Sequence, residues 1–260
     1  MLKITGLKKA FSLGAANEVQ ALAGVDLTVN PGEMVSIIGA NGSGKSTLIG
    51  CLAGAYIPDA GSIVLDGKDI TSWPEYKRAK LISRVFQDPL LGSCASMSVA
   101  ENLALAHRRG KVRGLRRGIA PGEKELFRAA LAPLGLSLEE RLNDPVGLLS
   151  GGQRQALTLI MATLVKPSLL LLDEHTAAQD PRTASLTMRL TQDLVEKERL
   201  TTLMITHNMA QAVEYGQRLV MLKEGRILKV FSGQEKKDLT VKTLLESFLA
   251  AGDDPALSDQ

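Results

Sequence analysis

The feature that most constrains this chain is a glycine-rich segment at residues 39–46, which reads GANGSGKS and fits the pattern G-x-x-x-x-G-K-[ST]. An apolar run at 35–38 stands directly before it, and a helical pattern at 45–53 follows. Glycines in such a loop let backbone N–H groups surround a phosphate chain at a helix N-terminus, where the helix dipole favours anions. The alternative is a glycine turn that happens to precede a lysine. The flanking strand and helix patterns favour phosphate binding.

This loop predicts a role for each of its polar residues. Lys45 is expected to reach the β- and γ-phosphates of a nucleotide, and the Ser46 hydroxyl to ligate Mg²⁺. The predicted nucleotide-binding residues of the segment are Gly39, Ala40, Asn41, Gly42, Ser43, Gly44, Lys45, Ser46 and Thr47.

A second motif combines a buried strand with two carboxylates. Four leucines at 169–172 precede Asp173 and Glu174, and ligands bind at the carboxyl ends of parallel strands. Asp173 can hold the Mg²⁺ shell, and Glu174 is placed to polarise a water for attack on the γ-phosphate. The alternative is a solvated strand end, which the accompanying phosphate loop disfavours.

Composition excludes several other classes of protein. With 45% hydrophobic residues among 260 the chain can fill a core, and 3% aromatic residues argue against aromatic girdles or stacking platforms. Two cysteines cannot make a disulfide framework or a four-ligand zinc site. The longest apolar stretch, 156–165, falls short of the roughly 20 residues of a membrane span. These observations predict a globular protein of the cytoplasm.

Patterning predicts an α/β fold. Apolar runs and turn signals alternate with helical periodicity in the first and last thirds, whereas the middle, about 90–165, is almost wholly helical. Strands are expected at 2–9, 22–30, 35–39, 62–66, 81–86, 168–173, 201–206, 217–222 and 226–231. Helices are expected at 45–53, 98–106, 123–134, 151–165, from Asp180-Pro181 onward and at 241–250. The prediction is a P-loop NTPase core with a mainly parallel sheet, an N-terminal antiparallel β region and an inserted helical subdomain.

The segment 149–153, LSGGQ, distinguishes this chain from other phosphate-loop proteins. Ser150 can cap the helix that follows, and Gly151 and Gly152 leave its first N–H groups bare. A second anion site arises there, one that a single nucleotide on Lys45 does not require. Taken as structure alone, the segment is a well-capped helix.

With these motifs the chain resembles the ATP-binding cassette family over about residues 1–233, and LSGGQ is the signature of that family. The resemblance implies that Ser150, Gly151, Gly152 and Gln153 contact nucleotide. It further implies a role for each of the following positions: Gln87 on Mg²⁺ and the attacking water, Asp180 in the D-loop 178–180, His207 as the switch histidine, and Phe11 stacked on adenine.

Two positions depart from the family pattern. His175 stands where proline commonly follows the catalytic glutamate, and Gln179 stands where an apolar residue usually precedes the D-loop aspartate. Because Gln87, Glu174 and His207 are all present, catalytic competence is expected. The geometry around the D-loop is the feature that these departures put in doubt.

The resemblance implies ATP and Mg²⁺ as cofactors and a head-to-tail dimer in which two nucleotides join two chains. It implies the ATPase subunit of a bacterial importer, peripheral on the inner face of the cell membrane, with integral-membrane permease subunits and, indirectly, an extracytoplasmic substrate-binding protein as partners. The region 91–117 and the segment 173–178, DEHTAA, resemble a group of cassette ATPases associated with amino-acid-type uptake systems, with tryptophan or tyrosine as the implied solute. An exporter ATPase, or a non-transport cassette acting on nucleic acid or ribosomes, is the alternative. No nucleic-acid partner is expected, because such cassettes usually carry two domains, zinc fingers or a coiled-coil insert.

The net charge of +3 comes from one segment. Six basic residues fall within ten positions: Arg108, Arg109, Lys111, Arg113, Arg116 and Arg117. This segment is either a solvated loop or a surface that faces anionic lipid or acidic permease loops. The tail, 234–260, is expected to form a helix followed by a disordered end.

Overall fold

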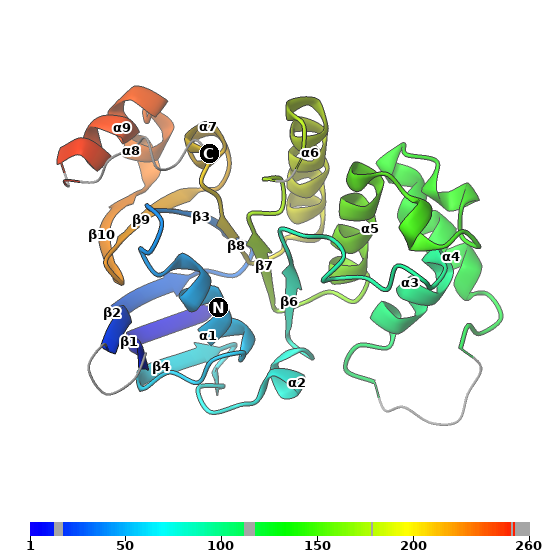
Figure 1. Cartoon of the computed structure of the whole chain (residues 1–260), viewed down its shortest axis with the longest axis horizontal. Helices are drawn as coiled ribbons and strands as arrows, with labels where there is room; N and C mark the ends of the chain where they lie inside the picture. Colours follow the sequence, from blue (N-terminus) through cyan, green and yellow to red (C-terminus); the bar gives the residue numbers. More distant parts are fainter. Residues whose placement is uncertain (13–17, 112–117, 178, 251, 253–260) are drawn as a thin grey trace.

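A computed structural model describes residues 1–12, 18–111, 118–177, 179–250 and 252. In this structure two β-sheets lie side by side, and a separate group of helices extends from them (Figure 1). The observed architecture confirms the predicted α/β class.

The larger sheet has six strands in the order β10-β9-β3-β8-β7-β6. Strands β3, β6, β7, β8 and β9 are parallel along their pairings, and β10 is antiparallel to β9. Their bounds are β3 Met34–Ile38, β6 Ile82–Val85, β7 Leu169–Asp173, β8 Thr202–Ile205, β9 Arg218–Lys223 and β10 Arg226–Phe231. The mostly apolar strands β3, β7 and β8 are buried almost throughout because both faces of the sheet are covered.

The smaller sheet is antiparallel, with the order β2-β1-β4-β5. Its strands are β1 Leu2–Ser12, β2 Glu18–Val29, β4 Ala60–Leu65 and β5 Lys68–Asp69. Helix α1, Lys45–Ala53, shares one apolar core with both sheets, through Leu48 and Ile49 of the helix, Ile4 of β1 and Leu169 of β7. This packing fixes the start of α1 against the edge where the parallel strands end.

The helices of the middle segment form their own apolar core. Helices α3 (Val99–His107), α4 (Glu123–Leu131) and α5 (Gly151–Thr163) surround Phe127, and Figure 1 shows them beside the long helix α6, Pro181–Glu198. The expected helix 123–134 ends as α at Leu131 and continues as a 3-10 turn over Ala132–Leu134, which contains Pro133. Further 3-10 turns span Leu138–Glu140 and Val146–Leu148.

Short helices complete the chain. They are α2 Glu75–Arg78, α7 Met209–Glu214, α8 Gly233–Lys237 and α9 Val241–Ala250. The tail helix α9 packs through Leu244 and Phe248 against Ala212 of α7. Residues 251 and 253–260, where a disordered end is expected, lie outside the described part. Among the described helices none combines the length and apolarity needed to cross a membrane.

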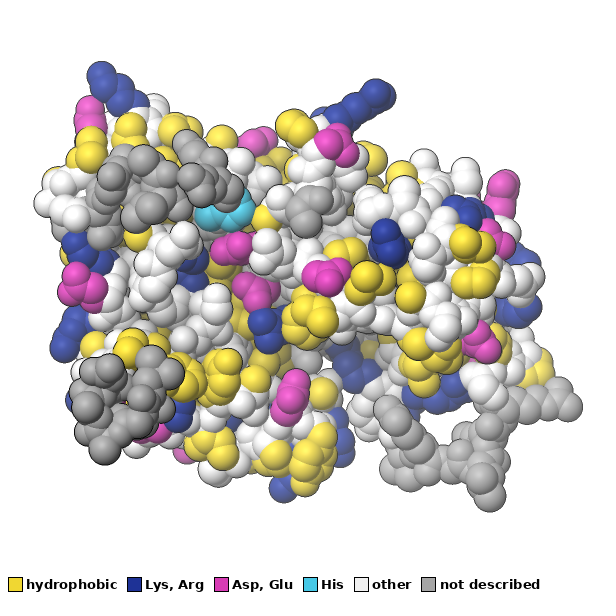
Figure 2. All heavy atoms as spheres, in the orientation of Figure 1, with side chains coloured by type: hydrophobic (Ala, Val, Ile, Leu, Met, Phe, Trp, Pro, Cys, Tyr) yellow, Lys and Arg dark blue, Asp and Glu magenta, His cyan; other side chains and the backbone are white. Residues whose placement is uncertain are grey.

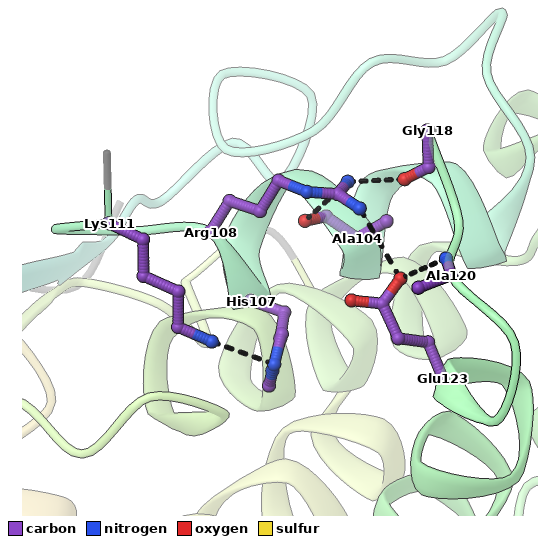
Figure 3. A network of polar contacts seen from close by, with 7 residues as sticks. All are labelled: Ala104, His107, Arg108, Lys111, Gly118, Ala120 and Glu123. Atoms are coloured by element: carbon purple, nitrogen blue, oxygen red, sulfur yellow. Dashed lines mark hydrogen bonds and ion pairs between the residues drawn. The ribbon is translucent and has the colours of Figure 1, made fainter. Parts of the chain in front are cut away.

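The basic segment is partly used inside the fold (Figure 3). Arg108 donates to the carbonyl of Gly118 and pairs with Glu123 at 3.4 Å. Arg109 donates to the carbonyls of Ala162 and Val165 at the end of α5. Lys111 Nζ lies 2.9 Å from Nε2 of His107. Thus all three described basic side chains of this segment contact protein groups. Arg113, Arg116 and Arg117 lie outside the described residues.

Candidate active site

The phosphate loop forms as predicted, between β3 and α1. Gly42 and Gly44 adopt φ values of +79° and +103°, which favour glycine, and Gly44 is the N-cap of α1 with no side-chain cap. Lys45 is buried, and its Nζ donates to the carbonyl oxygens of Gly39 at 2.7 Å and Ala40 at 3.0 Å. The lysine therefore bridges the loop from within.

The loop contains a polar atom that has no partner among the described residues. The Oγ atom of Ser43 is buried and bonds none of them, although buried hydroxyls are normally satisfied. Burial lowers the pKa of Lys45, and the nearby Glu174 and Asp173 counteract that shift. An unsatisfied hydroxyl, a partly desolvated cation and a helix N-terminus converge on one loop. This set of groups suits a nucleotide phosphate chain.

The two carboxylates at the end of β7 have different partners. Asp173 pairs with Arg84 of β6, with 2.5 Å between Nη2 and Oδ2. Glu174 faces His207, with 3.4 Å between Oε2 and Nδ1, and its backbone has φ of +47°. The hydrogen bond from His207 is the largest cause that lowers the pKa of Glu174. Glu174 is thus ionised and able to accept a proton at neutral pH.

Figure 2 shows acidic side chains and a histidine close together over the parallel strands. No cluster of three or more His, Cys, Asp or Glu side chains able to hold a metal ion exists among the described residues. A divalent cation here would need phosphate oxygens among its ligands as well as Asp173 and the Ser46 hydroxyl.

Gln87 is exposed and follows β6. It lies on the side of α5, which begins within the LSGGQ segment and is called the signature helix below. With Gly151, Gln155 and Gln179 it lines a cavity of about 180 Å³. Gln155 of α5 donates through Nε2 to the carbonyl of Phe86 at 3.2 Å. This contact links the signature helix to the residue that precedes Gln87.

The signature segment has the predicted cap. Ser150 accepts from the N–H of Gln153 at 3.3 Å, and Gln153 Oε1 accepts from the N–H of Ser150 at 3.1 Å. The two glycines serve different purposes. A Cβ on Gly152 would lie 2.5 Å from Cγ2 of Thr183, whereas a Cβ on Gly151 would meet no described residue within 4 Å. Gly152 allows α5 to approach α6, and Gly151 is open to an incoming group.

Asp180 caps α6 by accepting from the N–H groups of Arg182 and Thr183 at 3.1 Å. Ala178, the first residue of the predicted D-loop, lies outside the described residues. The ring of Phe11 meets Tyr56 edge-on at 5.1 Å between centroids, and Lys9 Nζ lies 5.6 Å from the ring centroid.

Helix α6 contacts both residues that depart from the family pattern, His175 and Gln179. His175 is buried and its Nε2 lies 3.1 Å from Oγ1 of Thr191, which itself donates to the carbonyl of Thr187 at 2.8 Å. Because the Thr191 hydrogen is used in that way, the histidine is the donor. Thr187 Oγ1 donates to Oε1 of Gln179 at 2.9 Å. Two threonines one helical turn apart thus anchor both unusual side chains.

Sequence reasoning missed Arg84. Its signal was a single basic residue inside the strand pattern of 81–86, and in the parallel register Arg84 lies opposite Leu171, two residues before Asp173. Nothing in the spacing along the chain shows that the two strands are neighbours.

Comparison with known proteins agrees with this geometry. A family model described as ABC transporter matches residues 22–177. The tyrosine transport ATP-binding protein of Clostridioides difficile (strain R20291) is 44% identical over 248 residues, which cover 95% of this chain and 98% of that protein. The phosphonates import ATP-binding protein of Alcaligenes faecalis is 36% identical, covering 88% of this chain and 82% of that protein.

Solved structures show the same fold. The ADP conformation of an ATP-binding cassette of an ABC transporter has a TM-score of 0.79 at 28% identity and covers 97% of each chain. A dimeric post-hydrolysis cassette bound to ADP and Pi has a TM-score of 0.74 at 29% identity, covering 88% of this chain and 97% of that one. The chain belongs to the ABC transporter family. Within that family it is an ATP-hydrolysing cassette.

Proposed function

We propose that this chain is the ATP-binding and ATP-hydrolysing subunit of an importer for a small solute of the amino-acid class. The near full-length similarity to a tyrosine transport ATP-binding protein supports the solute class. The phosphonates relative and a methionine import ATP-binding protein of Corynebacterium efficiens, 34% identical over 96% of this chain, support import.

One observation carries the mechanism: the chain holds two helix N-termini suited to anions, and they belong to different parts of the molecule. Figure 1 shows α1 among the sheets and α5 in the helical part. Two chains arranged head to tail would bring the partner's Ser150 and the partner's Gly151 onto the phosphates held at Lys45. The open space at Gly151 supports this arrangement.

The residues of the site divide the work of hydrolysis. Residues 39–47 hold the phosphate chain through backbone N–H groups and Lys45, and Phe11 contacts the adenine. Ser46, Asp173 and Gln87 would hold Mg²⁺, which neutralises charge on the phosphates. Glu174 orients the attacking water and accepts its proton, and His207 contacts the γ-phosphate. Gln153 and Asp180 keep the signature helix and α6 in position by capping them.

The organisation of the system follows from this role. We assign residues 1–233 to the cassette, with the helical subdomain at about 90–165, and 234–260 to a tail. The cassette would act on the inner face of the cell membrane, bound to permease subunits that a substrate-binding protein loads from outside, with no part for nucleic acid. The exposed Leu90 and Leu91 beside Gln87 support a docking surface for the permease.

Dimer formation tests the mechanism. Glu174→Gln removes the proton acceptor, so ATP and Mg²⁺ should convert this variant to a stable dimer in gel filtration. Glu174→Gln combined with Lys45→Ala is the matched control and should stay monomeric. A Glu174→Gln variant that remains monomeric with ATP contradicts the head-to-tail scheme.

Transport tests the solute class. The cassette is co-expressed with its genomically adjacent permease and binding protein, and uptake of labelled tyrosine is measured in cells with wild-type cassette or Lys45→Ala. Import predicts uptake that depends on Lys45. Export of the label, or ATPase stimulation by nucleic acid without any permease contact, would replace the import proposal with the corresponding alternative.

A further inference from the structure

Gln211 lies on α7 and lines the same cavity as Glu174 and His207. Its side-chain oxygen Oε1 accepts two hydrogen bonds, from Oγ1 of Thr176 at 3.2 Å and from Oγ1 of Thr206 at 3.0 Å. The backbone N–H of Gln211 donates to Oδ1 of Asn208, the N-cap of α7, at 3.0 Å. The glutamine is therefore fixed at its backbone as well as at its amide.

The two threonines belong to the two segments that carry the catalytic pair. Thr176 follows Glu174 by two residues, and Thr206 immediately precedes His207. Both threonines are buried, with 7% and 4% of their surface exposed. Hydroxyls removed from water in this way need a partner, and a single carbonyl oxygen with two lone pairs supplies both.

The sheet by itself does not hold these segments together. The pairing of β7 with β8 ends at Asp173 and Ile205, followed by one bond from the N–H of Glu174 to the carbonyl of Ile205 at 3.0 Å. Beyond that point Glu174 has φ of +47°, an unfavourable conformation for a residue with a side chain. The N–H of Thr206 still donates to the carbonyl of Ile37 on β3 at 3.3 Å, but among the described residues no backbone bond joins the two segments beyond Glu174. Side-chain contacts therefore hold them to each other there.

We infer that Gln211 is a positioning residue for hydrolysis: its amide oxygen, by accepting from Thr176 and Thr206, sets the 3.4 Å approach of Glu174 to His207. This inference rests on the proposed roles of Glu174 and His207. Only the oxygen of the amide serves the two threonines, so glutamate can replace glutamine here, whereas leucine cannot.

The test compares Gln211→Leu with Gln211→Glu in steady-state ATP hydrolysis. The leucine variant should lower kcat about tenfold while the KM for ATP changes less than about twofold, because the reacting groups move and the phosphate loop does not. The glutamate variant should recover kcat to within about threefold of wild type. Gln192→Leu is the matched control, since within the described part of the chain the Gln192 amide bonds Glu196 on the surface of α6, and it should leave both constants unchanged.

A measurement without nucleotide reports the geometry directly. The chain has three histidines, so ¹⁵N spectra can resolve the His207 ring. Gln211→Leu should shift the His207 ring signals, Gln211→Glu should return them toward wild type, and the His175 signals should stay in place. Thr176→Val, which is isosteric, should shift the same His207 signals. This variant replaces Gln211→Leu in the test if Gln211→Leu does not fold.

The outcomes separate the inference from the function on which it rests. Wild-type kcat in Gln211→Leu, or a loss that Gln211→Glu does not restore, overturns the positioning role. Normal hydrolysis in Glu174→Gln or His207→Ala overturns the proposed function instead. Thr176→Val can also be added to the Gln211→Leu variant. If it lowers kcat there by the same factor as in the wild-type protein, the two residues act independently, which also contradicts the inference.

Discussion

Arg84 and Asp173 form an ion pair between neighbouring parallel strands, with 2.5 Å separating Nη2 from Oδ2. The guanidinium also lies over the ring of Phe86, 4.5 Å from its centroid. One side chain thus contacts both the carboxylate proposed to hold Mg²⁺ and the residue that precedes Gln87. Among the described residues the buried Nε atom of Arg84 has no hydrogen-bond partner, so the guanidinium is held chiefly by these two contacts.

Removing this arginine should destabilise the nucleotide-free protein. The side chains of Arg84 and Asp173 are 24% and 13% exposed, so Arg84→Met leaves a largely buried carboxylate without its partner. The free energy of unfolding in urea should fall by about 2 kcal/mol. Arg128→Met is the control, because the pair of Arg128 with Glu125 is exposed and should be worth less than about 0.5 kcal/mol. Equal losses in the two variants would contradict the structural role of Arg84.

His175 should make the protein sensitive to acid. Burial lowers its pKa to about 4, whereas the ordinary value is 6.5. Below pH 6.5 this histidine binds a proton in the unfolded chain but stays neutral in the folded chain. The contribution of neutral His175 to the free energy of unfolding is therefore fully present above pH 6.5 and is lost as the pH falls toward 4. The loss should reach about 3 kcal/mol.

His175→Gln tests this prediction, because it keeps an N–H donor for Thr191 and does not titrate. The unfolding free energies of the two proteins are measured from pH 7 to pH 4.5. As the pH falls, the variant should lose less unfolding free energy than the wild-type protein. The effects of the carboxylates, which both proteins share, cancel in the difference. A constant difference across that range would show that His175 titrates normally in the folded protein.

The sequence predicted well what depends on residues close together in the chain. The phosphate loop, the cap at Ser150 and the cap at Asp180 all depend on spacings of a few residues, and the structure has each of them. The strand class was predictable because β3 and β7 are mostly apolar, as buried parallel strands usually are.

The contacts that sequence reasoning missed join residues far apart. Arg84 meets Asp173 across 89 positions, and Arg109 reaches the carbonyl of Ala162 across 53. Such pairs depend on strand order and helix packing, which local patterns do not encode. The same holds for His175, which stands where proline is common in the family. Its partner Thr191 lies on α6, 16 positions further along the chain, so the contact is visible only once α6 is placed.

The two signature glycines should respond differently to alanine. In Gly152→Ala the new Cβ would lie 2.5 Å from Cγ2 of Thr183, so the unfolding free energy should fall by about 1–3 kcal/mol. Thr183→Ser removes that methyl group and should restore most of the loss.

In Gly151→Ala no described residue within 4 Å opposes the new atom, so the fold should keep its stability. In the Glu174→Gln background, Gly151→Ala should instead reduce ATP-dependent dimerisation in gel filtration. Full dimerisation of that double variant would contradict an approach of the phosphates to Gly151.

Ser43→Ala should separate binding from folding. Its Oγ is buried with no partner among the described residues, so the substitution should leave the unfolding free energy unchanged or raise it by up to about 1 kcal/mol. ATP affinity measured by calorimetry should fall about tenfold, because a hydroxyl bonded to a charged phosphate is lost. Ser36→Ala provides the control: Ser36 is buried in the preceding strand and donates to the carbonyl of Tyr215 at 2.8 Å, so its loss should cost about 1 kcal/mol of stability without weakening ATP binding. If Ser43→Ala loses as much stability as Ser36→Ala and binds ATP normally, the Ser43 hydroxyl serves the fold and not the nucleotide.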